Sequence, residues 1–394
     1  MRIAFFTDSY HPVVSGVVSS LDGIAKGMVE RGHEIRIICP EFPPDRMQDV
    51  FDDEKILRVP SGTAIVTPDR IGFPWRTAET WKLVEEFQPD IVHMQTEFTL
   101  GAMGRNYCRY SGLPVLSTCH TYYEMYMGSY LPFLPRTPAK ALCRSWIKAT
   151  YFNDDFIIVP SKHIREVLQG YGLKKEYRVI PSGVDERMFK PEPEAGLAFR
   201  QSLAAERPGF GEGPLLMYAG RIGLEKNLDM LASAMRTVFA ARPDARLLMV
   251  GGGPARDEVE SIFQRMGLND RVAWFGFMKR SQLPAIYSAC DLFVFPSTTE
   301  TQGMVTIEAM LCGLPVVGVA RMGTAEIMAG DEGGLLSPDD PEVFAEKVLT
   351  LLEDGELRSR KASEARSHGM KWSLGVCLDK LEGFYCHVRD SRKD

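Results

Sequence analysis

Short, uniformly apolar segments alternate along the chain with longer segments in which apolar residues recur every three or four positions. The short segments are rich in Ile, Val, Leu and Phe, as are strands buried on both faces of a sheet, and the longer ones predict helices that pack on it. This alternation predicts parallel βαβ units. We expect one series of strands at 3–6, 35–38, 56–59, 91–94, 115–118, 156–159 and 179–180, and a second at 215–218, 246–250, 272–275, 292–295 and 315–319.

The two series indicate an α/β protein with two domains. A chain of 394 residues is too long for one ordinary hydrophobic core. Segments rich in Pro and Gly at 190–196 and 207–214 are typical of a linker and a surface loop, so we place the domain boundary near residue 190. The prediction is a Rossmann-like domain at 1–190, a second at 191–371 and a C-terminal helical segment at 372–394. Ligands of such sheets bind at the carboxyl ends of the strands.

Composition and charge exclude several classes of protein. The formal net charge of −6 argues against a dedicated nucleic-acid binder. The eight cysteines are scattered without C-x-x-C pairs or zinc spacing, and we expect reduced cytosolic thiols. The N-terminus has the pattern of a strand rather than of a signal peptide, and no apolar run approaches the ~18 residues of a membrane span. Any membrane association is therefore expected to be peripheral.

The most informative motif is a pair of glutamates between the predicted strand 292–295 and a following helix. Glu300 lies in the loop and Glu308 on the helix, with Gly303 at the join. Free N–H groups at the start of a helix favour an anion such as phosphate. Carboxylates accept hydrogen bonds from sugar hydroxyls but repel phosphate. The combination suits a ligand that carries both groups, such as a nucleotide sugar.

Two cations follow the first predicted strand of the second domain. Arg221 and Lys226 could clamp a diphosphate, because Arg supplies planar bidentate donors and Lys a mobile point charge. The alternative is a solvated surface loop, where most Arg and Lys residues lie. The glycine-rich strand end at 251–253 is weak evidence by itself, and it lacks the Gly-Lys-Ser/Thr of a Walker motif.

Two strand ends of the first domain carry further candidates. Ser15, Gly16 and Val17 stand at a helix start, where bare backbone N–H groups could approach a phosphate or sugar. His120 ends the strand at 115–118, and a neutral imidazole there could hydrogen-bond a sugar hydroxyl. The alternatives are a glycine needed only for a turn and a structural histidine.

A basic segment of the first domain is the second informative feature. No Asp or Glu occurs from 125 to 153, and a helix is expected to start with Thr137 as N-cap and Pro138 as first residue. A basic stripe with apolar neighbours in an acidic protein predicts contact with an anionic membrane. An ordinary amphipathic helix with solvated charges is the alternative. The segment contains Tyr130, Phe133, Leu134, Arg136, Lys140, Leu142, Arg144, Trp146, Ile147 and Lys148.

Together these features resemble the retaining glycosyltransferases of family 4, which have the GT-B fold of two Rossmann-like domains with parallel sheets facing across a cleft. The resemblance covers nearly the whole chain. In the second domain it rests on Gly220-Arg221, the Glu225-Lys226-Asn227 segment, the glycines at 251–253 and the E-x7-E pair, in that order. It implies that the last helix crosses back to the first domain.

The resemblance also implies roles for the candidate residues. Glu308 would bind the ribose hydroxyls and Glu300 the transferred sugar, while Arg221 and Lys226 would hold the diphosphate. The first domain would approach the phosphate and sugar through amides around Gly16 and through His120. Further donor contacts are implied for the backbone amides of Gly303, Met304 and Val305 and for the backbone near Phe277, which would read the base.

Within the family, segments 10–20 and 120–126, which include Tyr122 and Glu124, look most like the bacterial 1,2-diacylglycerol 3-alpha-glucosyltransferases. Such an enzyme moves glucose from UDP-glucose to the free hydroxyl of diacylglycerol at the inner face of the cell membrane. Retention in this family is attributed to a front-face mechanism without a protein nucleophile. The metal-binding D-x-D of other glycosyltransferases is absent, and we expect no metal cofactor.

Three alternatives remain open at this point. A retaining enzyme of the same fold could act on a soluble sugar, a sugar phosphate or an inositol lipid, since fold analogy does not determine the substrate. An inactive nucleotide-sugar or membrane-binding module is a second possibility. A dehydrogenase fits poorly, because the first strand-to-helix turn lacks G-x-G-x-x-G. The oligomeric state is not predicted.

Overall fold

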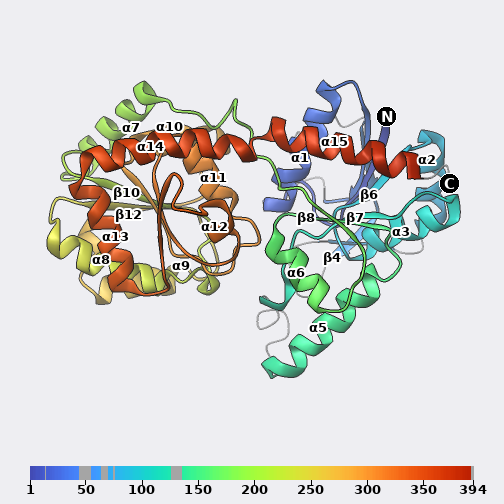
Figure 1. Cartoon of the computed structure of the whole chain (residues 1–394), viewed down its shortest axis with the longest axis horizontal. Helices are drawn as coiled ribbons and strands as arrows, with labels where there is room; N and C mark the ends of the chain where they lie inside the picture. The colour runs from blue at the N-terminus through green and yellow to red at the C-terminus, as the bar shows by residue number, and fades with distance from the viewer. Residues whose placement is uncertain (14, 44–54, 64–69, 74–75, 126–134, 392–394) are drawn as a thin grey trace. The chain divides into compact units, whose positions relative to one another are not determined.

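The computed structural model describes residues 1–13, 15–43, 55–63, 70–73, 76–125 and 135–391. These form two compact units (Figure 1): unit 1 is Met1–Gly183 with Leu374–Asp394, and unit 2 is Val184–Ser373. The chain therefore passes from unit 1 to unit 2 a few residues before the predicted position 190. The segment expected to be a linker instead starts helix α7 (Pro193–Glu206), because Pro is favoured in the first helical turn.

Unit 1 is built on a seven-stranded sheet in which every pairing is parallel. Each strand predicted in the first half is present, although the one expected at 179–180 lies mainly before these residues. The strand order β3-β2-β1-β6-β7-β8-β9 reverses direction between β1 and β6. The strands are β1 (Arg2–Phe6), β2 (Glu34–Pro40), β3 (Ile56–Val59), β6 (Ile91–Met94), β7 (Leu116–Thr118), β8 (Phe156–Val159) and β9 (Glu176–Val179).

Helices and a small ribbon complete unit 1. Helix α15, near the end of the chain, lies beside α1 (Figure 1), and its Leu374, Leu378 and Phe384 share a core with Ile3 and Phe5 of β1. The sequence pattern did not reveal the antiparallel ribbon of β4 (Ser61–Thr63) and β5 (Arg70–Gly72). The helices are α1 (Gly16–Glu30), α2 (Thr77–Phe87), α3 (Thr99–Ser111), α5 (Arg136–Tyr151), α6 (Lys162–Gly170) and α15 (Leu374–Asp390).

Unit 2 has a six-stranded parallel sheet of order β12-β11-β10-β13-β14-β15, which is the 3-2-1-4-5-6 order of the doubly wound fold. The five predicted strands are present. The sixth, β15 (Gly334–Ser337), was missed because Gly-Leu-Leu-Ser has no β-branched or aromatic residue. The other strands are β10 (Leu215–Ala219), β11 (Arg246–Val250), β12 (Val272–Phe275), β13 (Leu292–Phe295) and β14 (Val316–Val319).

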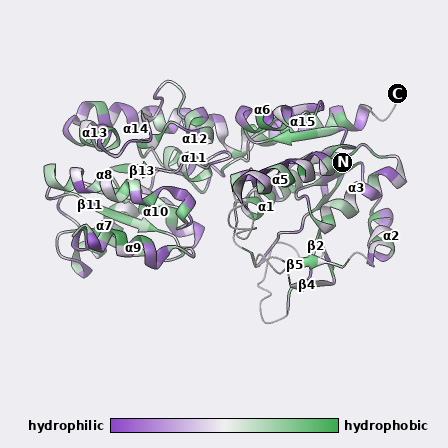
Figure 2. Cartoon of the chain, turned by 90° about the horizontal axis from the view of Figure 1, so that it is seen from below, coloured by the Kyte–Doolittle hydropathy of each residue, from purple (hydrophilic) through white to green (hydrophobic). Residues whose placement is uncertain are grey.

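Helices of unit 2 such as α8 (Leu228–Ala241) and α13 (Pro341–Glu353) have a buried apolar face and an exposed polar face, whereas α11 (Met304–Leu311) is almost fully buried and the strands are almost wholly apolar (Figure 2). Residues of β10 and β13, such as Leu216 and Phe293, are completely buried. The apolar core therefore leaves polar chemistry to the strand ends and loops. The other helices are α7, α9 (Arg256–Arg265), α10 (Leu283–Ala289), α12 (Met322–Ile327) and α14 (Gly355–Gly369).

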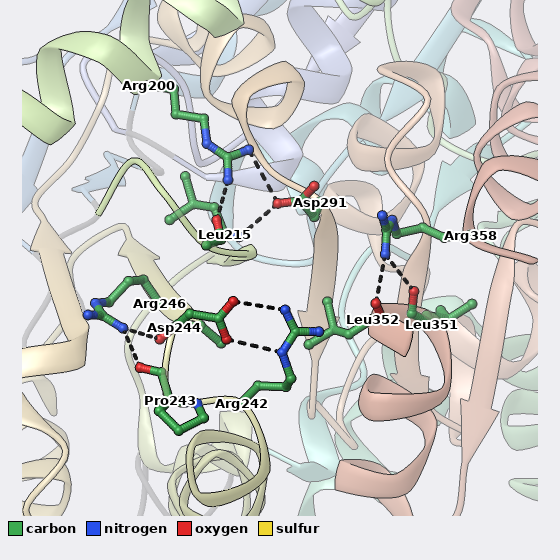
Figure 3. Close-up of polar contacts among 12 residues, drawn as sticks. Arg200, Leu215, Arg242, Pro243, Asp244, Arg246, Asp291, Leu351, Leu352 and Arg358 are labelled. Carbon is green, nitrogen blue, oxygen red and sulfur yellow. Dashed lines mark hydrogen bonds and ion pairs between the residues drawn. The ribbon is translucent and has the colours of Figure 1, made fainter. Parts of the chain in front are cut away.

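Polar contacts at the amino ends of the unit 2 strands are structural (Figure 3). Asp291, just before β13, accepts a hydrogen bond from the amide of Leu215 at 2.8 Å and lies 3.3 Å from Nη1 of Arg200. Arg242 and Asp244 form a second ion pair just before β11, at 2.9 Å. These contacts tie strand starts to α7 and α8, at the edge opposite the one where ligands of such sheets bind.

Unit 1 contains a buried ion pair whose loss should be costly. Arg105 Nε lies 3.1 Å from Asp154 Oδ1, both side chains are almost fully buried, and Ser117 Oγ donates to Asp154 at 2.5 Å. We expect Asp154→Asn to lower the free energy of unfolding by about 3–5 kcal/mol, because it leaves the guanidinium buried without its counter-charge. Urea unfolding followed by circular dichroism measures this loss.

The matched control is the exposed pair of Arg76 and Glu79, which are 2.7 Å apart with 45% and 60% of their side chains exposed. Glu79→Gln removes the same kind of charge and should change stability by less than about 1 kcal/mol. Equal effects of the two substitutions would contradict the structural role of Asp154.

Candidate functional site

The carboxyl ends of β10 and β13 bring Lys226 and Glu300 into contact. Lys226 Nζ lies 2.5 Å from Glu300 Oε1, and Ser297 Oγ donates to the same oxygen at 2.8 Å. Only 12% and 15% of the Lys226 and Glu300 side chains are exposed. The strand order reverses between β10 and β13, which is where doubly wound sheets bind ligands. The pair is thus a partly desolvated ionic contact at the expected ligand position.

Arg221 lies in the same loop but is less constrained. Its side chain is 57% exposed, and its guanidinium is 3.8 Å from Glu225 Oε1. Tyr218, which is fully buried in β10, donates a hydrogen bond to the main-chain oxygen of Arg221 at 3.0 Å and holds the loop. The mostly exposed guanidinium of Arg221 can therefore turn to an incoming anion, at the cost of its contact with Glu225, whose Oε1 is buried and has no hydrogen-bond partner among the described residues.

The backbone of the glycine-rich segment after β11 packs against this loop. Ile222 donates its amide to Gly252 at 2.9 Å, and Gly220 donates to Val250 at 3.0 Å. A Cβ on Gly253 would stand 2.2 Å from the carbonyl oxygen of Ile222. The run of glycines allows the two strand-end loops to pack backbone against backbone, which gives the motif a structural reason.

The join between β13 and α11 has the geometry of an anion site. Gly303 is the N-cap of α11 with a φ of +89°, a conformation that favours glycine. The first amides of the helix, at Met304 and Val305, lack intrahelical acceptors by construction and can bind a phosphate. Amide N–H of Gly323 donates to the main-chain oxygen of Glu300 at 3.0 Å, which ties the Glu300 loop to the start of α12.

Two hydroxyls beneath this helix start are buried without a hydrogen-bond partner among the described residues. They belong to Thr306 of α11 and Thr324 of α12, and both lie within 3.7 Å of the position that a Cβ on Gly303 would take. No sequence pattern singles them out. They leave hydrogen-bonding capacity close to the N-terminus of α11.

Glu308 is the second glutamate of the motif and is held by two side chains. Arg280 Nη2 lies 2.5 Å from its Oε1, and the hydroxyl of Tyr287 donates to Oε2 at 3.3 Å. Burial raises the pKa of Glu308, and the nearby Arg280 opposes that rise. Neither Arg280 nor Tyr287 was predicted from the sequence. Phe277, predicted to lie near the base, is 74% exposed, with its ring over Gly252.

In unit 1, the predicted Ser15, Gly16 and Val17 form the start of α1. Ser15 is the N-cap and accepts a hydrogen bond from the amide of Val18 at 3.3 Å, while Gly16 is exposed. The preceding loop is anchored on Asp22, which accepts a hydrogen bond from the Tyr10 hydroxyl at 2.8 Å and pairs with the ring of His11. The helix start thus exposes the backbone of Gly16, at a position where first-turn amides have no intrahelical acceptor.

His120 follows β7 and is half-buried. Its Nε2 lies 2.8 Å from Oε1 of Gln95, a residue that follows β6 and that the sequence patterns did not reveal. Burial lowers the pKa of His120 to about 4. The imidazole is therefore neutral at physiological pH, as a hydrogen-bonding contact to a sugar hydroxyl requires.

The predicted membrane face of α5 is only partly as expected. The helix begins at Arg136, with Pro135 rather than Thr137 as N-cap, because Pro can occupy the start of a helix without losing a hydrogen bond. Ile147 is buried and is therefore not available to lipid. Trp146 is half-buried and stacks on the exposed Phe98 with ring centroids 5.5 Å apart.

The basic residues of α5 differ in their partners. Arg144 forms an ion pair with the buried Glu124, to which Tyr122 also donates a hydrogen bond, so these three residues form a cluster of their own. Lys140 and Lys148 are exposed, and so is 55% of Leu142. The side chain of Arg136 and residues Tyr130, Phe133 and Leu134 lie outside the described part of the structure.

Within the described ranges, no group of three or more metal-ligating side chains comes together, and no helix is long and apolar enough to cross a bilayer.

The two doubly wound units, with a cation, an acidic pair and a helix N-terminus at the switch point of unit 2, place the chain in the Rossmann-like α/β class, whose members bind ligands at this position. The family models agree with this class. "Glycosyltransferase Family 4" matches residues 14–187, and "Glycosyl transferases group 1" matches residues 200–368. The chain belongs to glycosyltransferase family 4 and has the GT-B fold, as the sequence predicted.

Curated relatives and a solved structure support the assignment. The chain is 31% identical to the alpha-monoglucosyldiacylglycerol synthase of Streptococcus pneumoniae, over 80% of this chain and 70% of that protein. It is 28% identical to a GDP-mannose-dependent alpha-mannosyltransferase of Mycobacterium tuberculosis, over 100% and 98%. The structure superposes on sucrose-phosphate synthase from Thermosynechococcus elongatus with a TM-score of 0.80, 21% identity and 99% coverage of both chains.

The backbone packing at Gly253 predicts an effect on the cation loop. We expect Gly253→Ala to weaken nucleotide-sugar binding about tenfold. The added methyl group would push the Ile222 carbonyl away and so move Arg221 and Lys226. Such overpacking typically costs about 1–3 kcal/mol. Isothermal titration calorimetry with nucleotide sugars measures the change. Gly355→Ala, at a position where a Cβ would meet nothing within 4 Å, should leave binding unchanged. Unchanged binding by Gly253→Ala would contradict this role of the glycine segment.

Proposed function

We propose that this glycosyltransferase moves glucose from UDP-glucose to the free hydroxyl of diacylglycerol, with retention of the anomeric configuration and without a metal ion. We place the reaction at the inner face of the cell membrane. The family membership is shown by the sequence comparisons. The donor, the acceptor and the stereochemistry are our proposal, supported by the site geometry and by the similarity to a glucosyldiacylglycerol synthase.

The contact of Lys226 with Glu300 beside the N-terminus of α11 carries the donor half of the proposal. A diphosphate bound at the helix start would compete with Glu300 for the lysine ammonium. Once Lys226 turns to the diphosphate, the Glu300 carboxylate can accept hydrogen bonds from the hydroxyls of the transferred sugar. Arg221, exposed and nearby, adds a bidentate donor as negative charge grows on the leaving group. Two side-chain cations and the helix amides can then stabilise that charge.

Glu308 is suited to the ribose. Arg280 donates to one of its carboxylate oxygens and Tyr287 to the other, and each oxygen has a further lone pair that can accept from a ribose hydroxyl. Arg280 also favours the ionised form of this buried group, which is the form that accepts two hydrogen bonds. The base would then lie towards the exposed Phe277.

We adopt for the chemistry the front-face mechanism to which retention in this family is attributed, and the sequence candidates agree with it because none resembles a protein nucleophile. In a front-face reaction the acceptor oxygen forms its bond to the anomeric carbon on the side that the diphosphate leaves. The bond from that carbon to the phosphate oxygen breaks, and the acceptor proton passes to the departing phosphate oxygen. The protein's part is to position the reactants and to stabilise the leaving group.

A mannosyl donor is the second candidate. A GDP-mannose-dependent mannosyltransferase is 28% identical over the whole chain, so the same donor site could accept GDP-mannose. Incubation with each nucleotide sugar, with diacylglycerol in mixed micelles or soluble sugars as acceptors, and detection of released UDP or GDP separates these possibilities. Release of UDP that depends on both UDP-glucose and diacylglycerol supports the proposal. Turnover only with GDP-mannose or only with a soluble acceptor would overturn it.

Glu300 provides the most direct test of the donor site. We expect Glu300→Gln to lower kcat by about 10²-fold or more, because the site loses the charge that binds the sugar hydroxyls in the transition state. UDP should still bind, since the helix amides and Arg221 remain. The matched control Glu258→Gln removes an exposed carboxylate of α9 and should keep full activity. Wild-type activity of Glu300→Gln would be incompatible with this site.

The exposed lysines of α5 support a peripheral membrane contact. Lys140, Lys148 and the apolar Leu142 are exposed on a helix without acidic residues. Lys175, whose ammonium lies 5.9 Å from the ring centroid of the exposed Phe152, adds charge near the end of this helix. A lysine near an anionic bilayer contributes about 1 kcal/mol to binding. This favours a lipid acceptor over a soluble one.

Liposome flotation tests the membrane contact. With vesicles containing anionic lipid at physiological salt, the wild type should float, and Lys140→Glu with Lys148→Glu should bind at least about tenfold more weakly, because two attractive charges become repulsive. The control, Lys190→Glu with Lys380→Glu, makes the same charge change at two exposed positions outside α5. Equal loss in both double variants would point to net charge rather than to α5.

A further inference from the structure

A chain of hydrogen bonds runs from His120 through the interior of unit 1 to the C-terminal helix. Gln95 Oε1 lies 2.8 Å from His120 Nε2, and Gln95 Nε2 lies 3.1 Å from Nδ1 of His93. The hydroxyl of Tyr385, on α15, is 2.8 Å from the same Nδ1, and Thr118 Oγ1 is 2.7 Å from His93 Nε2. His93, Gln95, Thr118 and Tyr385 are all buried.

The direction of these bonds determines which nitrogen of His120 carries its proton. An amide oxygen can only accept a hydrogen bond, so Nε2 of His120 must be the donor to Gln95. The amide group of Gln95 and the hydroxyl of Tyr385 then both donate to the single lone pair on Nδ1 of His93. His93 carries its own proton on Nε2 and donates it to Thr118. Nδ1 of neutral His120 is left as an acceptor, and within the described part of the chain it makes no hydrogen bond.

The surroundings favour neutral rings on both histidines. A small cavity beside them is lined mainly by apolar side chains, among them Ile158, Leu374 and Leu378, and by no Asp, Glu, Lys or Arg. The titratable groups that contact the histidines or line this cavity are Cys377 and Tyr385 of α15. Burial lowers the pKa of His93 to about 3 and that of His120 to about 4. Among the described residues, no carboxylate forms an ion pair with either ring that would stabilise an imidazolium.

We propose that Gln95, backed by His93 and Tyr385, is a positioning residue that holds His120 as the Nε2–H tautomer, so that Nδ1 accepts a hydrogen bond from a hydroxyl of the substrate. The inference deepens the proposed function and rests on it for the identity of that hydroxyl, which would belong to the transferred sugar. A glutamine is suited to this task because it is neutral and carries both a donor and an acceptor. A carboxylate at the same position would instead favour the doubly protonated ring.

The test compares Gln95→Glu with Gln95→Met. We expect Gln95→Glu to raise the pKa of His120 by more than one unit and Gln95→Met to leave a mixture of tautomers. Nitrogen-15 NMR of the imidazole rings in ligand-free protein measures both, with His120→Gln assigning the signal. For glycosyl transfer at neutral pH, Gln95→Met should lower kcat about threefold to tenfold, the size expected for one lost orienting hydrogen bond, with little change in the donor KM.

The control Gln169→Glu introduces the same charge at an exposed position of α6 and should change neither His120 nor kcat. For Gln95→Glu, the kcat profile should gain a fall at acidic pH that follows the raised His120 pKa. The proposal is wrong if wild-type His120 shows no single tautomer, or if its pKa is the same in wild type and Gln95→Glu. If the wild type transfers no sugar, the proposed function fails, while the NMR result still decides the role of Gln95.

Discussion

The parallel pairing of adjacent strands, β10 with β13 in unit 2 and β6 with both β1 and β7 in unit 1, is the constraint on which both sets of candidate residues depend. Parallel strands buried on both faces have no room for polar side chains along their length, so polar groups collect at the strand ends. At a switch point the helices that follow two adjacent strands leave on opposite faces, and the two strand-end loops lie next to each other. In this way Lys226 and Glu300, 74 residues apart in sequence, come within 2.5 Å.

The two units use electrostatics in opposite ways. In unit 2 the candidate residues are charged and paired with one another, as in Lys226 with Glu300 and Arg280 with Glu308. Such pairs limit the cost of partial burial until a charged ligand can exchange with one partner. In unit 1 the histidines His93 and His120 are kept neutral by burial, and His120 is hydrogen-bonded to a neutral glutamine rather than to a carboxylate. Binding a diphosphate requires charged side chains, as in unit 2, whereas binding a sugar hydroxyl requires only a neutral hydrogen-bonding group, as in unit 1.

Much of the fold and part of the candidate site could be predicted from the sequence. Strands such as those at 246–250 and 292–295 were predicted because each contains a continuous run of at least four apolar residues, whereas β15 has only two apolar residues between Gly334 and Ser337. The segment after 190 was assigned to a linker on its prolines, although a Pro at the first helical position is also a helix start. The basic stripe on α5 was predicted from the four-residue spacing of its Lys and Arg residues. That spacing does not show that Arg144 forms an ion pair with Glu124.

By itself, the sequence determined the βαβ order, the E-x7-E pair and the cations after a strand, because local periodicity and residue type are written in the chain. Only the tertiary structure decided which of these groups meet. The contacts of Gln95 with His120, of Arg280 with Glu308 and of Gly253 with the backbone of Ile222 join distant segments. They depend on strand order and on loop packing at close range. Strand order and loop packing leave no local pattern in the sequence, because the partner of a side chain depends on the folded chain around it and not on the spacing of residues along the sequence.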